Sequence, residues 1–143
     1  MAIETWMVQL KSVMAEVEGI EQVHIYDELP GSLMAFPCLV ILPLRGEQEY
    51  GASAPGVAIH EVQMTLYVAS QVLPEANGRA VPFIKKIRDQ LAGHAQLNGS
   101  VNYILPASPF YEGPGGIQYG DKTHTGIIFR VRVKETEAIN VVA

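Results

Sequence analysis

The residue types that most often carry chemistry are present in this chain but scattered along it. The chain has four histidines, His24, His60, His94 and His124. They form neither an H-x-x-x-H nor an H-E-x-x-H pattern, so their spacing gives no support for a zinc site. The single cysteine, Cys38, lies in an apolar run with no histidine near it in the sequence. A lone cysteine cannot form an internal disulfide or a thiolate cluster, so we interpret it as a small buried apolar residue.

Two further motifs match a catalytic or phosphate-binding pattern only in part. Asp27 and Glu28 are adjacent carboxylates, but they lie in a predicted turn from which their side chains would diverge. The glycine-rich residues 113–116 lack the Gly-Lys-Ser/Thr ending of a phosphate loop and precede a predicted strand rather than a helix. The sequence therefore predicts no catalytic, metal-binding or cofactor-binding residue, and we expect a protein that is not an enzyme.

Composition and charge limit the possible functions further. The hydrophobic content of 48% and charged content of 17% are typical of one globular domain, here residues 1–143. The net charge of -5 argues against general nucleic-acid binding, and the chain lacks the apolar run that a membrane helix needs. Residues 1–75 hold ten acidic and two basic residues, whereas residues 76–143 hold five acidic and eight basic ones. Such polarity could let unlike surfaces of two copies meet; chance is the alternative.

Two segments have the apolar periodicity of amphipathic helices. Residues 3–17 repeat apolar side chains three or four positions apart, and Gly19 ends the pattern. Residues 79–92 repeat this spacing, with Pro82 in a first turn where its missing N–H is not needed. We interpret residues 71–78 as the connection that leads into this second helix.

Five segments have strand character. Residues 58–70 and 123–137 alternate apolar and polar side chains, which predicts two long strands with one buried and one exposed face. Shorter strands are predicted at residues 22–26, 36–44 and 101–105. The order of helices and strands predicts an α+β fold, a mainly antiparallel β-sheet with two α-helices packed on one face. We expect the 58–70 strand to lie at the centre of this sheet.

The remaining segments are predicted connections. Residues 45–57 are long for a hairpin turn. We expect a protruding arm, a loop that becomes ordered on assembly, or a surface loop without a partner. Residues 110–122, rich in glycine and tyrosine, follow a strand that Pro106 and Pro109 are expected to end. Residues 138–143 are interpreted as a mobile tail.

Three motifs follow one another along the chain. They are F-P-C-L-V-I-L-P at residues 36–43, L-N-G-S-V-N-Y-I-L-P at residues 97–106, and G-G-I-Q-Y-G-D-K-T-H-T-G-I-I-F-R-V-R-V at residues 115–133. In this order they resemble the tail terminator (tail-completion) proteins of long-tailed bacteriophages, and the resemblance extends over residues 3–137. It implies a small α+β subunit of a hexameric ring that caps the finished tail tube, stops its polymerisation and joins it to the head connector.

The resemblance also implies partners and a location. The partners are other copies of this chain, the tail tube protein and the head connector or neck protein. DNA only passes through the lumen of the ring, and neither a membrane nor a cofactor is involved. The protein would belong to the virion, at the neck end of the tail, and would reside in the host cytoplasm during assembly. Our hypothetical interaction residues are Arg45, Glu47, Glu49, Tyr50, Tyr111, Tyr119, Arg130 and Arg132.

Two alternatives stay open. The chain could be another virion component, such as a neck, head-completion or tail tube subunit. It could instead be a small ligand-binding or enzymatic α+β domain that uses residues 110–122 over a pocket. A deep pocket with converging polar groups would favour this last interpretation.

Overall fold

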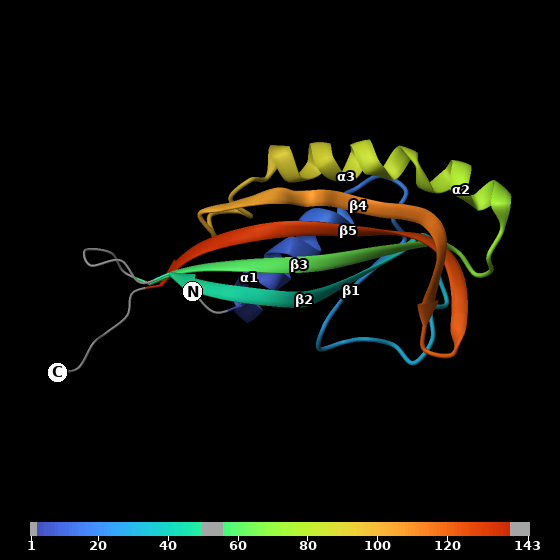
Figure 1. The fold of residues 1–143 in the computed structure, drawn as a ribbon, viewed down its shortest axis with the longest axis horizontal. Coiled ribbons are helices and arrows are strands. Elements are labelled where there is room, and N and C mark those ends of the chain that lie inside the picture. The colour runs from blue at the N-terminus through green and yellow to red at the C-terminus, as the bar shows by residue number, and fades with distance from the viewer. Residues whose placement is uncertain (1–2, 50–55, 138–143) are drawn as a thin grey trace.

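The described residues form a five-stranded sheet whose one face is covered by helices (Figure 1). The structure is a computed structural model that describes residues 3–49 and 56–137. The strands are β1 Gln22–Ile25, β2 Cys38–Glu49, β3 Gly56–Ala69, β4 Tyr103–Tyr119 and β5 Lys122–Glu137. They lie in the order β1-β2-β3-β5-β4, with β1 parallel to β2 and all other neighbours antiparallel. The predicted α+β fold with a mainly antiparallel sheet is confirmed, and β3 lies at its centre.

The helices are α1 (Ile3–Ala15), α2 (Pro74–Ala80) and α3 (Pro82–Gly93). α2 and α3 follow each other almost without interruption, because Val81 between them keeps helical backbone angles. Pro82 interrupts the segment, since a proline has no N–H to donate to the carbonyl group four residues earlier. The two predicted helices therefore exist, as α1 and as the α2–α3 segment.

α2 lies where we expected a connection, so our interpretation of residues 71–78 was wrong. Asn77 and Gly78 are poor helix formers, which is why the sequence suggested a loop. Ala76 and Ala80 are fully buried in the core, however. Packing of these two small side chains stabilises the helix against the weak local propensity.

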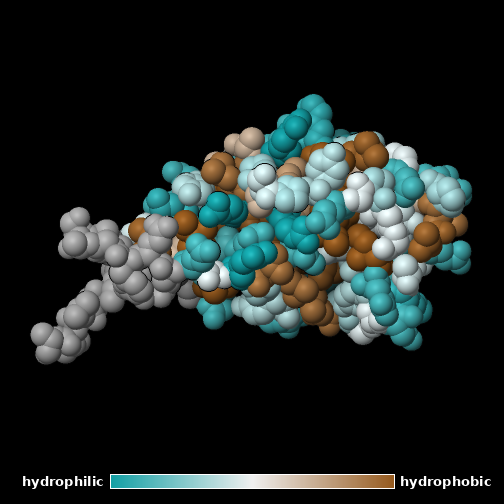
Figure 2. All heavy atoms as spheres, viewed as in Figure 1, coloured by the Kyte–Doolittle hydropathy of each residue, from teal (hydrophilic) through white to brown (hydrophobic). Residues whose placement is uncertain are grey.

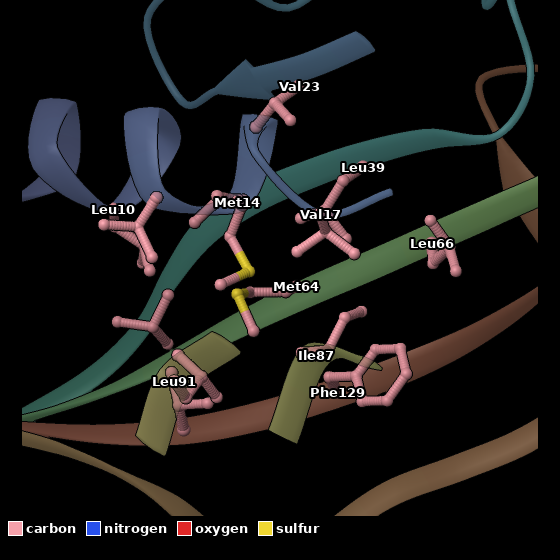
Figure 3. Packing of buried hydrophobic residues seen from close by; sticks show 14 of the residues in the cluster. Leu10, Met14, Val17, Val23, Leu39, Met64, Leu66, Ile87, Leu91 and Phe129 are labelled. Atoms are coloured by element: carbon pink, nitrogen blue, oxygen red, sulfur yellow. The ribbon is translucent and has the colours of Figure 1, made fainter. Parts of the chain in front are cut away.

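The main core lies between the helices and the sheet. Its largest fully buried side chains come from all layers: Figure 3 shows Met14 of α1, Met64 of β3 and Phe129 of β5, with Ile87 and Leu91 of α3 beside them. These residues recur every three or four positions on the helices and every second position on the strands, as one-sided burial requires. The predicted apolar stripes of the first and last helical segments are thus confirmed.

A second, smaller cluster lies on the other face of the sheet, which we call the outer face. It covers only the part of that face where β3 ends, so the expectation that β3 exposes its whole second face was wrong. Tyr67 is buried there and packs edge-on against Tyr119 at a centroid distance of 5.8 Å. Residues 26–37 cross over this area, and the Tyr119 hydroxyl donates a hydrogen bond to the Pro30 carbonyl group. The buried members of the cluster are Leu33, Cys38, Val40 and Tyr67.

β4 is much longer than the predicted strand at residues 101–105, and the expected connection at residues 110–122 was wrong. The strand continues past its prolines to Tyr119. Its pairing with β5 shifts register twice, between Pro106 and Tyr111 and again between Glu112 and Gly115. β4 is the edge strand of the sheet, where prolines and bulges are tolerated because one side of the strand needs no partner.

The prediction of a long connection at residues 45–57 was wrong for both ends of this segment, which belong to β2 and β3. β2 runs on to Glu49, and Arg45 to Glu49 pair with Val57 to Glu61 of β3. Gly46 allows this pairing, because a Cβ atom there would lie 3.2 Å from Nδ1 of His60 on β3. Residues 50–55 lie outside the described residues, as does the expected tail at residues 138–143.

Candidate functional site

The part of the outer face that residues 26–37 do not cover carries charged side chains on neighbouring strands. Arg45 of β2 and Arg132 of β5 both lie opposite Glu61 of β3 in the strand register. Cross-strand partners point to the same side of a sheet, so Glu61 lies between two arginine positions. We call this area the charged face; its members are Arg45, Glu47, Glu61, Glu112, Arg130, Arg132 and Lys134.

Two ion pairs connect the strands of the charged face. Arg45 Nε lies 3.2 Å from Glu61 Oε2, and Arg130 Nη1 donates a hydrogen bond of 2.7 Å to Glu112 Oε1. Each pair is open to solvent on at least one side, so each contributes only about 0.2–1 kcal/mol to folding. Figure 2 shows hydrophilic residues over the strands with separate hydrophobic patches beside them. The ion pairs of the charged face therefore contribute little to the stability of the fold, and its exposed side chains are accessible to a partner.

A shallow hollow lies within the charged face. Its volume is about 160 Å³. Small-molecule sites usually enclose at least about 300 Å³, so this hollow suits a single side chain of a partner better than a metabolite. The lining residues are Arg45, Glu47, Ile59, Glu61, Ala107, Ser108 and Arg132.

Four of the eight predicted interaction residues come together on this face. Arg45, Glu47 and Arg132 line the hollow, and Arg130 lies two positions from Arg132 on the same side of β5. Lys134, which the alternation along residues 123–137 places in the same row but which was not among the eight predicted residues, has its Nζ 5.7 Å from the ring centre of Tyr103.

The other four predicted residues are not part of this group. Tyr119 belongs to the second cluster, where burial raises the pKa of its hydroxyl group, so its role is structural. Tyr111 lies on the edge strand β4 and is 43% exposed, with its ring edge-on to Phe110. Glu49 ends β2, but its side chain is not among those described, and Tyr50 lies outside the described residues.

A buried polar pair lies on the helix-covered face near the same end of the sheet. His60 Nε2 lies 2.9 Å from Glu135 Oε1, and the Trp6 ring of α1 is 5.3 Å from the imidazole ring. Glu135 is only 2% exposed. The predicted hydrogen bond of His60 is confirmed; its side chain is 16% exposed, and the Glu135 side chain that it contacts is buried.

The buried position of Cys38 also indicates a structural role. Cys38 is fully buried, and burial raises the pKa of its thiol from 9.0 to about 11, which makes it a poor nucleophile. Among residues 3–49 and 56–137, no group of three or more His, Cys, Asp and Glu side chains could hold a metal ion. None of the helices described is long and apolar enough to cross a membrane.

The two consecutive halves of the chain lie side by side in the fold and are not interleaved. α1, β1, β2 and β3 come from the first half and build one side of the molecule. α3, β4 and β5 come from the second half and build the other side, with α3 packed beside β4 and α1 beside β1. The acidic excess of residues 1–75 and the basic excess of residues 76–143 therefore fall on different strands of the sheet, although Lys86 of α3 places its Nζ 3.3 Å from the Glu18 carbonyl oxygen of the acidic half.

Comparison with known proteins gave no relative. A scan against models of protein families found no match to this chain, and a search of curated proteins found none either. The resemblance to tail terminators thus depends on the three sequence motifs alone.

Proposed function

We propose that this protein is a structural subunit of a bacteriophage tail, a ring-forming tail terminator. In this role it caps the tail tube at the neck end, stops tube polymerisation and joins the tube to the head connector. The observation that carries the proposal is the charge difference between the two sides of the sheet. A ring of identical subunits needs two different surfaces that fit each other, because each subunit meets its neighbours head to tail.

The three motifs that carry the resemblance support the same proposal. Residues 36–43 lead into β2, residues 97–106 lead into β4, and residues 115–133 make up most of the hairpin of β4 and β5. Together they contribute to strands β2, β4 and β5, of which β4 forms the edge of the sheet opposite β1. These strands are where a subunit that acts by assembly would meet its neighbours, the tube and the connector. The proposed ring is a hexamer through which DNA passes.

The alternative is a neck or tail tube subunit, because the same charge difference would also favour contacts between copies of such a subunit. A tube subunit polymerises by itself, whereas a terminator binds only at the end of an existing tube. Electron microscopy of the purified protein separates the two, because open-ended tubes from this chain alone would identify a tube subunit.

The proposed function can be tested with tubes assembled from the tail tube protein encoded by the same phage. We expect the purified chain to form a density at one end of each tube in negative-stain images. Tubes mixed with the chain should also stop lengthening when fresh tube protein is added. Tubes with bare ends and unchanged growth, at concentrations well above that of tube ends, would refute the proposal.

A further inference from the structure

We infer that two copies of this chain bind head to tail through two different surfaces, one around the β1 edge of the sheet and one on its outer face. One is the acidic side, the exposed carboxylates around β1: Glu16, Glu18, Glu21, Asp27 and Glu28. The other is the basic side, the outward row of β5: Arg130, Arg132 and Lys134. The inference rests on the proposed ring and names the surfaces by which its subunits meet.

The acidic side is contacted by cations of α1 and α3; Lys86 of α3 places its Nζ 3.3 Å from the Glu18 carbonyl oxygen. Residues 16–28 contain five acidic residues and no lysine or arginine. Lys11 of α1 pairs with Glu28 and lowers the pKa of that carboxyl group, and His94 lies 4.0 Å from Glu16. Among the described residues, Glu18, Glu21 and Asp27 make no side-chain ion pair, so this side keeps an excess of negative charge.

Carboxylates neutralise part of the positive charge on the basic side, and an excess of positive charge remains. The charged face carries four cationic side chains against three carboxylates, which leaves a net charge of about +1. Arg45 pairs with Glu61, and Arg130 pairs with Glu112. Arg132 is exposed, and it has no ion pair within the described part of the chain. It is therefore the cation most available to a carboxylate of a second copy.

Each side also exposes large apolar residues, which a stable contact needs in addition to charge. Leu105 lies opposite Arg132 in the register and is 50% exposed, and Tyr111 on the same edge strand is also exposed. Leu29 is exposed next to Glu28, before residues 30–37 cross the outer face. Interfaces between proteins combine an apolar centre with a polar rim, and charge complementarity then selects the partner surface.

The second copy is the occupant that these features favour. Opposite charges on two different surfaces of one subunit suit a head-to-tail contact, in which each copy uses one surface of each kind. Pairing through the backbone of β4 is disfavoured, because Pro106, Pro109 and Pro114 cannot donate hydrogen bonds from that edge. The contact therefore depends on side chains, and we expect it to weaken as salt screens the charges.

Charge reversal on each side provides the test. Arg132→Glu makes the basic side acidic, and Glu21→Arg makes the acidic side more basic. We expect the wild-type chain to self-associate in light scattering at low salt and each variant alone to associate about tenfold more weakly, because like charges then face each other. An equimolar mixture of the two variants should regain wild-type association. In alternating order, the changed surfaces meet each other and the unchanged surfaces meet each other.

Matched controls use the same charge changes elsewhere. Arg88→Glu on α3 and Glu75→Arg on α2 alter exposed residues outside both surfaces and should leave association unchanged. Arg132→Gln serves if Arg132→Glu does not fold, and it should show a smaller loss in the same direction. Variants that associate like wild type, or a mixture that shows no recovery, would overturn the inference, as would a chain that stays monomeric. A chain that passes this test but leaves tube ends bare would refute only the proposed function.

Discussion

The two faces of the central sheet differ in how they are closed. The helix-covered face is mainly apolar, apart from the His60–Glu135 pair near one end, and α1 and α3 close it with side chains such as Met14 and Leu91. The outer face is closed only where β3 ends, by residues 26–37 and the β4–β5 hairpin, and is charged and open elsewhere. The difference indicates that the first face carries most of the stability, while the open part of the second is available for partners.

Removal of a large side chain from the helix-covered face should have the largest effect. Phe129 is fully buried, and we expect Phe129→Ala to lower the free energy of unfolding by about 3–5 kcal/mol. Tyr111 is the cross-strand partner of Phe129 but is 43% exposed, so Tyr111→Ala should cost under about 1 kcal/mol. Urea denaturation of both variants checks the comparison. Equal losses would mean that the two residues do not differ in burial as described.

The second largest loss of stability is expected at Gly126, where the backbones of β3 and β5 lie close together. A Cβ atom on Gly126 would lie 2.4 Å from the Leu66 carbonyl oxygen, so Gly126→Ala must push β3 and β5 apart. We expect a loss of about 1–3 kcal/mol. The partner residue Gly115 has open space at the same position, and Gly115→Ala is the matched control. Melting temperatures of the two variants that coincide would contradict this account.

High pH should weaken the second cluster. Burial raises the pKa of the Cys38 thiol from 9.0 to about 11 and that of the Tyr67 hydroxyl to about 12. The folded state therefore holds these protons more tightly than the unfolded chain. This stability is complete below about pH 9 and is lost as the pH rises through the folded pKa. Denaturation at pH 8 to 11 should show a decrease that is shallower in Cys38→Ala; the same slope in both chains would exclude Cys38 as its source.

The smallest effect is expected on the charged face. Arg45 and Glu61 form an ion pair at 3.2 Å, but the Arg45 side chain is 67% exposed. A double-mutant cycle with Arg45→Gln and Glu61→Gln should give a coupling energy of about 0.2–1 kcal/mol that decreases in salt. A salt-independent coupling energy several times larger would show that this pair belongs to the stability of the fold rather than to an open surface.

Period and composition were sufficient to predict the fold class from the sequence. The alternation at residues 58–70 and 123–137 identified the two longest internal strands, and the spacing at residues 3–17 identified α1. These signals are local, because the spacing of apolar residues within a single helix or strand identifies its buried face. The segments that failed depend on distant partners. α2 is stabilised by the core around Ala76. β4 continues beyond its prolines because it is an edge strand, and its place at the edge follows from the topology of the whole sheet.

The candidate site was predictable in its residue types but not in its grouping. Arg130 and Arg132 were recognisable as one row because they alternate along a single strand. Arg45 joins them only through the register of three strands, with Glu61 in the middle. Tyr119 resembled an exposed contact residue in the glycine-rich sequence around it, yet it fills the second cluster. Register and loop crossings are properties of the whole chain, which a reading of separate segments does not contain.

The prolines of β4 have a consequence for reversibility. A sheet whose last strand could accept another strand would fuse with its neighbour through many backbone hydrogen bonds, and the product would persist like a fibril. Here that route is interrupted at three positions, so copies that meet at this edge can separate again. In the proposed ring, misplaced subunits would then exchange until the geometry closes, which permanent strand fusion would prevent.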